Sequence, residues 1–253
     1  MNGAQHNNMT RKPEGYRPVL QTDNAKTSKG TKYGYLTGIM YLAPANESGR
    51  INLCPMATDG CKAGCLFTAG LASVHASINR ARLAKTHFML DNPEAFIASL
   101  RYDIAALARK ADKLGLKPAV RINGTSDVPK IAMQLASEFP NVQFYDYTKL
   151  PKAWMRTAAN YHLTFSHSEN NEAECISALQ HGVNVAVVFD TRKGQTLPES
   201  WNGYSVIDGD QSDLRFLDPA GVIVGLRAKG KAKHDVAGFV VPVNQLVSIG
   251  VSA

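Results

Sequence analysis

The sequence predicts an α/β protein, an irregular or partial (β/α) barrel of parallel strands of the TIM-barrel type. Short apolar runs alternate with segments of helical period, and polar residues follow nearly every run. The run VNVAVVF at 183–189 is apolar on both faces, as in a parallel strand covered on both sides. The second half lacks clear helices and contains the loop TRKGQTLPESWNGY, so an open doubly wound sheet is the alternative.

The chain is expected to form one β/α domain over residues 31–253, preceded by a flexible arm over residues 1–30. The arm is rich in Asn, Lys, Thr and Gly and has almost no apolar period. Strands are expected at 35–42, 119–122, 142–146, 162–166, 183–189, 205–207, 222–226 and 239–241.

Helices are expected between the early strands. The longest begins at Asn92–Pro93, a pair typical of a helix N-terminus, and stops at Gly115. The others are expected over about 73–89, from Pro129, from Pro151, and over about 171–181 before Gly182.

Composition limits the possible environments. The chain of 253 residues carries a formal net charge of +7 and a pI near 9.2, which allows a polyanionic partner such as nucleic acid. It contains no apolar run of about 18 residues to cross a membrane. Its N-terminus is polar and does not read as a signal peptide, so we expect a cytoplasmic protein.

A glycine-rich loop at 52–70, NLCPMATDGCKAGCLFTAG, contains three of the four cysteines. Cys54, Cys61 and Cys65 are spaced C-x6-C-x3-C after the first strand, where the loop would lie at the mouth of the barrel. Three thiolates without a fourth suit a [4Fe–4S] cluster with one open iron, to which S-adenosylmethionine could bind. A zinc site with a remote ligand such as His75 or Cys175 is the main alternative, and a disulfide is disfavoured in the cytosol. Cys175 itself is expected to be a buried core residue.

Charged and amide side chains lie within or beside the ends of the apolar runs. Because the carboxyl ends of parallel strands converge on one face, these side chains are candidate ligand-binding residues, although structural ion pairs are the alternative. The candidates are Arg121, Asn123, Asp127, Asp146, Lys149, Asp208, Asp210 and Lys229.

Five long motifs resemble an uncharacterised bacteriophage family of the "gene product eighty-eight" type. They are LAPANESGRINLCPMATDGCKAGCLFTAG, RINGTSD, FYDYTKLP, NYHLTFSHSEN and VIDGDQSDLRFLDPAGVIVGLRAKGKA. The resemblance implies a phage protein acting in the cytoplasm of an infected bacterium and implies no reaction. The cysteine count and placement also resemble, more distantly, the radical S-adenosylmethionine barrels, whose usual spacing is C-x3-C-x2-C.

Three functions compete on this basis. The first is an iron–sulfur protein, radical-S-adenosylmethionine-like if it is an enzyme, with the eight candidates lining a pocket above the cluster. The second is a nucleic-acid-associated protein with a structural zinc or cluster site. It rests on the basic pI, the lysines of TDNAKTSKGTKYG, and LRAKGKAKH with its cations from Arg227 to Lys233. The third is a small-molecule-binding barrel in which the cysteine loop is only structural.

Overall fold

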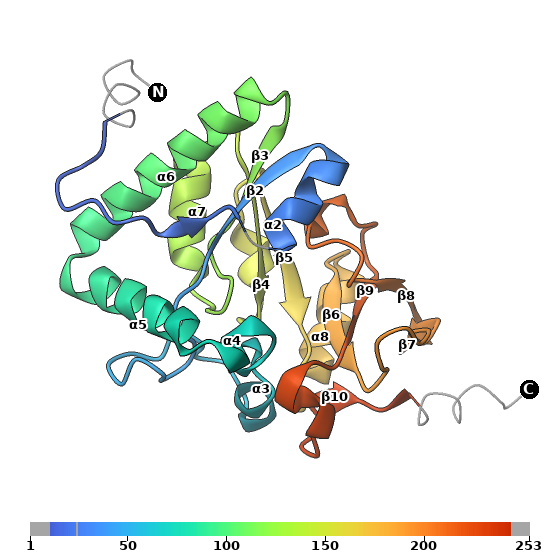
Figure 1. Ribbon diagram of the computed structural model, residues 1–253. Coiled ribbons are helices and arrows are strands. Elements are labelled where there is room, and N and C mark those ends of the chain that lie inside the picture. The colour runs from blue at the N-terminus through green and yellow to red at the C-terminus, as the bar shows by residue number, and fades with distance from the viewer. Residues whose placement is uncertain (1–10, 24, 244–253) are drawn as a thin grey trace, which may run out of the picture. The chain divides into compact units, whose positions relative to one another are not determined.

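The described residues, 11–23 and 25–243 of the computed structural model, form ten strands of a mostly parallel sheet together with α and 3-10 helices (Figure 1). The chain divides into two compact units. Unit 1 comprises the residues up to Leu53, then Asn79–Asp146 and Thr157–His162. Unit 2 comprises Cys54–Ile78, Tyr147–Arg156 and the chain from Leu163 onward.

Unit 1 is built on β2 (Tyr35–Met40) and β3 (Lys117–Arg121), which pair in parallel from Tyr35 opposite Lys117 to Ile39 opposite Arg121. The short β1 (Leu20–Gln21) runs antiparallel to β2. The unit also contains most of β4 (Gln143–Thr148) and the start of β5 (Tyr161–Ser166).

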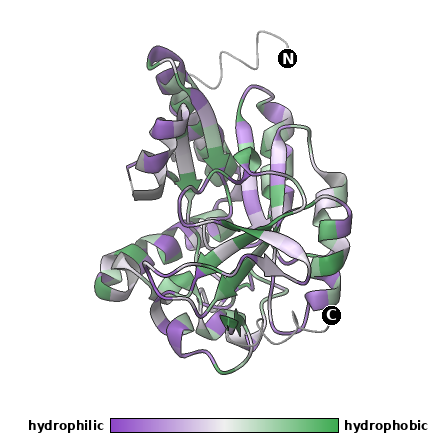
Figure 2. Cartoon of the chain, turned by 90° about the vertical axis from the view of Figure 1, so that its right-hand side faces the viewer, coloured by the Kyte–Doolittle hydropathy of each residue, from purple (hydrophilic) through white to green (hydrophobic). Residues whose placement is uncertain are grey.

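The longest helix of unit 1 follows the expected amphipathic pattern. In α6 (Pro93–Lys113), Phe96, Leu100, Ile104, Leu107 and Ala111 are buried at spacings of three and four, as predicted. Figure 2 shows that the helices carry both hydrophilic and hydrophobic residues. The other helices are α2 (Ala25–Gly30), the 3-10 helix η1 (Thr31–Tyr33), most of α5 (Ala76–Asp91) and α7 (Pro129–Glu138).

Unit 2 is centred on β6 (Val185–Phe189), which pairs in parallel with β9 (Ile223–Arg227) and with the end of β5. The short β10 (Val240–Val241) pairs with the last two residues of β6, beyond the point where β5 stops. The unit is completed by β7 (Ser200–Trp201), β8 (Tyr204–Asp208), α3 (Asp59–Ala63), α4 (Leu71–Val74), α8 (Glu172–Gln180) and the 3-10 helices η2 (Leu66–Thr68), η3 (Ala153–Arg156), η4 (Arg215–Leu217) and η5 (Gly230–His234).

The core of unit 2 lies between β6 and α8. Phe165, Val187 and Phe189 pack there with Cys175, which is fully buried and has a free thiol. The expectation that Cys175 is a core residue is therefore confirmed.

The predicted α/β class and the mostly parallel sheet are confirmed. Hydrogen-bonded neighbours follow the order β1-β2-β3-β4-β5-β6-β9-β8-β7, with β10 beside β6. This path has two ends, so the sheet of the described residues is not closed and a barrel is not shown. The helix expected from Pro151 is reduced to the 3-10 turn η3, and β1 and β7 were not expected. Residues 1–10 of the expected arm lie outside the described residues, whereas its remainder includes β1 and α2.

Candidate functional site

The cysteine loop of unit 2 is fastened by one carboxylate. Glu169, in the segment after β5, accepts hydrogen bonds from the Thr58 hydroxyl (2.6 Å) and from the Gly60 N–H (2.8 Å). Thr58 is the N-cap of α3 and accepts the N–H of Cys61. A Cβ at Gly60 would lie 2.8 Å from the Glu169 Oε1 and 2.9 Å from the Cβ of Phe239, so only glycine fits there. The loop is thus held by the protein itself.

The iron–sulfur hypothesis is wrong. Among the residues that the structure describes, no three or more Cys, His, Asp and Glu side chains are grouped so that they could hold a metal ion. Cys54, Cys61 and Cys65 are partly exposed and form no disulfide bond. The zinc alternative is wrong for the same reason, and the S-adenosylmethionine expectation rested on the cluster.

Two of the three thiols have contacts within the protein. Cys61 packs against an apolar cluster that contains Ala232 and Phe239. The Sγ of Cys65 accepts the N–H of Phe67 at 3.5 Å, a contact within the loop. The glycines that suggested a loop wrapped around a cluster serve this packing, since Gly64 lies against Ala232 and Phe239.

In unit 1, the carboxylate of Asp146 is the centre of a buried hydrogen-bond network. Only 1% of Asp146 is exposed, and it accepts the backbone N–H of Asn123 (2.7 Å), the amide of Asn123 (2.9 Å) and the hydroxyl of Tyr161 (3.0 Å). Burial raises the pKa of Asp146 to about 7, against the opposing effects of these hydrogen bonds and of Arg121. Burial, with the Asp146 charge beside it, also raises the pKa of Tyr161.

The Asp146 network shapes the loop after β3. Asn123, held by Asp146, accepts the Ser126 hydroxyl (3.0 Å) and the Val128 N–H (2.9 Å) through its own side-chain oxygen. Asp127 lies in this loop, and its backbone N–H donates to the carbonyl of Leu53 (2.8 Å). The structure therefore brings three sequence candidates, Asn123, Asp146 and Arg121, into one network, with Asp127 on the loop that it supports.

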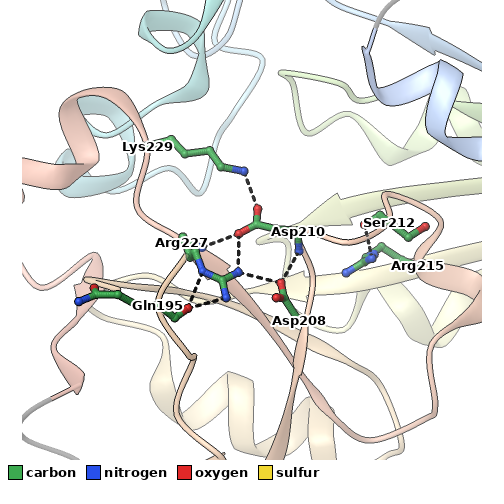
Figure 3. Close-up of polar contacts among 7 residues, drawn as sticks. All are labelled: Gln195, Asp208, Asp210, Ser212, Arg215, Arg227 and Lys229. Atoms are coloured by element: carbon green, nitrogen blue, oxygen red, sulfur yellow. Dashed lines mark hydrogen bonds and ion pairs between the residues drawn. The ribbon is translucent and has the colours of Figure 1, made fainter. Parts of the chain in front are cut away.

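In unit 2, three further candidates meet in an ion-pair network at the ends of β8 and β9 (Figure 3). Arg227 donates to Asp208 (2.9 Å) and Asp210 (3.2 Å), and Lys229 donates to Asp210 at 2.5 Å. Arg227 also donates twice to the carbonyl of Gln195. Burial acts to raise the pKa of Asp210, but the hydrogen bonds from Lys229 and Arg227 outweigh it, and the net shift is downward.

Lys149, the last sequence candidate, lies near an aromatic ring. Its ammonium is 5.6 Å from the centroid of the Phe239 ring, within cation–π range. Whether the eight candidates bind a small ligand stays a prediction, because each has contacts within the protein that account for its position.

A surface that the sequence predicted only in part, through the lysines of TDNAKTSKGTKYG, lies at the amino ends of β2 and β3 in unit 1. The backbone N–H of Lys117, the first residue of β3, donates to the carbonyl of Gly34 (2.9 Å), directly after η1. This bond joins the start of β3 to the residue after η1, and α6 ends three residues before β3. Figure 1 shows α2 and this end of α6 at the same end of the two strands. Six exposed cations on these elements form what we term the basic surface: Lys29, Lys32, Arg109, Lys110, Lys113 and Lys117.

The two units also differ in net charge. The sequence of unit 1 contains 17 Lys and Arg against 10 Asp and Glu, whereas unit 2 contains 11 of each. The whole formal net charge of +7 therefore belongs to unit 1. The charge run ARKADKLGLK at 108–117 could have indicated part of the basic surface from the sequence. The linear pattern did not show that this run lies at the same end of the strands as Lys29 and Lys32.

Three comparisons bear on these observations. A family model described as Gene product 88 matches residues 18–242, a range that includes all five motifs quoted above. No curated protein and no solved structure matches the chain. The resemblance to radical S-adenosylmethionine barrels thus gains no support. Among the described helices, none is both long enough and apolar enough to cross a membrane.

Proposed function

The chain belongs to the Gene product 88 family, the phage family that its motifs resemble, and from this premise we propose that it binds nucleic acid through the basic surface of unit 1. The observation that carries the proposal is the convergence of six exposed cations from four separate elements on one edge of the sheet. Such a surface suits the closely spaced phosphates of a nucleic acid. A phage protein with this activity would act in the cytoplasm of the infected bacterium.

The alternative explanation of the basic surface is helix stabilisation. Lys110 and Lys113 lie in the last turn of α6, and Lys29 in that of α2, where cations offset the negative end of a helix dipole. Each such end is equivalent to roughly half an elementary negative charge, so two ends amount to about one. Six cations with Asp112 as an acidic neighbour in the same helix exceed that several-fold. Helix stabilisation alone therefore does not account for the positive charge of the basic surface.

The basic segment of unit 2, LRAKGKAKH, supports the proposal less well. Arg227 and Lys229 are engaged with Asp208 and Asp210, so a phosphate would have to displace these carboxylates. Lys231 and Lys233 are exposed, but the unit as a whole has no net charge. We therefore site the interface in unit 1.

The test compares two charge-reversal triples with the same change in net charge. The first is Lys32→Glu, Lys113→Glu and Lys117→Glu in the basic surface. The second is Lys193→Glu, Lys231→Glu and Lys233→Glu in unit 2, all of which are exposed. Binding is measured by fluorescence anisotropy with labelled oligonucleotides of about 20 nucleotides, between about 50 and 200 mM salt.

We expect the wild type to bind with an affinity that falls steeply with salt. The affinity of the unit 1 triple at low salt should be about 100-fold or more below that of the wild type. The slope of its log affinity against log salt should be smaller by about 2–3, because each lost phosphate contact removes roughly 0.7–0.9 from that slope. The unit 2 triple should lose only a few-fold. Equal losses in the two triples would refute the siting, and a wild type that binds no oligonucleotide at low salt would refute the function.

A further inference from the structure

We infer that the basic surface selects single-stranded over double-stranded nucleic acid, with the ring of Tyr33 as a stacking platform for a base. This inference rests on the proposed nucleic-acid binding and adds to it the class of ligand. Its origin is a feature that phosphate contacts alone do not explain: two large apolar side chains are exposed among the cations. Tyr33 is 47% exposed and Leu114 is 56% exposed.

Tyr33 is held in place by its backbone. It is the last residue of η1, and the N–H of Gly34 donates back to the carbonyl of Thr31 (3.1 Å). Gly34 ends the turn with φ of 80°, a left-handed conformation that favours glycine. The carbonyl of Gly34 is then fixed by the N–H of Lys117. The exposed ring therefore projects from a rigid turn, which lowers the entropy cost of stacking a base on it.

The elements that flank Tyr33 along the chain and across the sheet both contribute cations. Lys32 precedes Tyr33 directly, and Lys117 is tied to the residue after it. Leu114 follows Lys113 and precedes Lys117 by three residues, so a second apolar side chain comes from the helix side of the same edge. An aromatic ring flanked by cations is the arrangement by which proteins bind single strands, because every base has a face to stack and every nucleotide has a phosphate.

Duplex binding is the less suitable alternative. A protein commonly reads a duplex by placing a helix in the major groove, with the N-terminal residues of that helix at the bases. The basic surface instead presents the C-terminal ends of α6 and α2, which are not the helix ends that read bases in this mode. In a duplex the bases are also stacked on one another, so their faces are closed to Tyr33.

The experiment measures binding of three probes of about 20 nucleotides: single-stranded oligo(dT), a duplex of mixed sequence, and an abasic strand of the same length. The variants are Tyr33→Ala and Tyr33→Phe, where the second keeps the ring and removes only the hydroxyl. We expect the wild type to prefer oligo(dT) to the duplex. Tyr33→Ala should weaken oligo(dT) binding about tenfold and change duplex and abasic binding less than about twofold, whereas Tyr33→Phe should bind all three like the wild type.

The outcomes separate this inference from the function on which it rests. If Tyr33→Ala binds oligo(dT) as tightly as the wild type while the Lys32, Lys113 and Lys117 reversals abolish binding, the nucleic-acid function stands and the stacking inference is overturned. Equal or tighter wild-type binding to the duplex would overturn it as well. If the wild type binds none of the probes at low salt, the proposed function itself fails. Circular dichroism of Tyr33→Ala confirms that the variant is folded.

Discussion

Unit 1 and unit 2 each contain charged residues at the ends of buried strands, and the two units accommodate these charges differently. In unit 1, Asp146 is buried, and its carboxylate is surrounded by neutral donors from Asn123 and Tyr161. In unit 2, Asp210 is partly exposed and is paired with two cations, Arg227 and Lys229. The same residue type therefore has a raised pKa in one unit and a lowered pKa in the other.

The difference shows that burial of a carboxyl group and its pairing with cations give opposite dependences of folding stability on pH. A carboxyl group whose folded-state pKa is raised stabilises the fold most at low pH, because its neutral form is the one that the buried site prefers. A carboxyl group whose pKa is lowered stabilises the fold at neutral pH and loses that contribution as pH falls below its ordinary value of 3.8. The predictions that follow test this contrast, beginning with the largest effect.

Removal of the Asp146 carboxylate should have the largest effect on stability. Asp146→Ala leaves the Asn123 amide and the Tyr161 hydroxyl without their acceptor in a buried site, and removes the counter-charge near Arg121. We expect a loss of about 3–5 kcal/mol in the free energy of unfolding. Urea denaturation followed by circular dichroism measures it. A loss below about 1 kcal/mol would show that the network does not organise the loop after β3.

The pH dependence of stability should identify Asp146 as the group with the raised pKa. Because its folded-state pKa is about 7 and its ordinary value is 3.8, its stabilising contribution is complete below about pH 4 and is lost as pH rises to about 7. Asp146→Asn cannot ionise, so its stability relative to the wild type should rise across this window and level off above it. Denaturation at several pH values between about 4 and 8 tests this. A constant difference between the two proteins would mean that Asp146 is ionised throughout.

The ion-pair network of unit 2 should contribute less and should respond to salt. Arg227→Met removes the guanidinium that joins Asp208 and Asp210 and keeps an unbranched apolar side chain. Since the Arg227 and Asp210 side chains are 14% and 20% exposed, we expect a loss of about 1–2 kcal/mol that shrinks in molar salt. Asp146→Ala, measured alongside, should lose the same stability at both salt concentrations. Salt-independent loss in Arg227→Met would mean that packing, and not charge, holds the network.

The sequence predicted much of the fold because periodicity and strand runs are local properties. The stripe from Phe96 to Ala111 defined α6, and the apolar run at 183–189 contained β6. It missed β1 and β7, which have two residues each, because strands so short carry no period. The helix expected from Pro151 rested on one residue type and is a 3-10 turn.

The sites were harder to predict than the fold, because partners distant in the chain decide what a charge or a thiol does. The sequence identified Asp146 and Asp210 as strand-end charges, but it did not show that the first would meet Tyr161 and the second Arg227. The cysteine spacing alone favoured an iron–sulfur cluster. The hydrogen bond from Thr58 to Glu169, which holds the loop, could not be seen in the sequence because it joins residues 111 positions apart. The basic surface depends likewise on the pairing of β2 and β3, which brings Lys117 to Gly34, the residue after the turn that contains Lys32.

The smallest predicted effect concerns the cysteine loop, where a partly buried carboxylate accepts neutral donors as Asp146 does. Glu169→Gln keeps the size of the side chain but replaces one of its two acceptor oxygens with an amide donor. Either Thr58 or Gly60 then loses its acceptor. The loop should then open more often, so Cys61 should react with a maleimide about 3–10 times faster, with little change in global stability.

The matched control for this measurement is Glu172→Gln, which removes the same charge from an exposed residue of unit 2 whose carboxylate bonds only the Asn202 amide among the described residues. It should leave the thiol rates unchanged, and the buried Cys175 should stay unlabelled in every variant. If Glu169→Gln reacts no faster than this control, the loop is held by the packing of Phe239 on Gly60 and Gly64 and not by the carboxylate. Apolar contacts would then hold the cysteine loop of unit 2, whereas a buried carboxyl group holds the loop after β3 in unit 1.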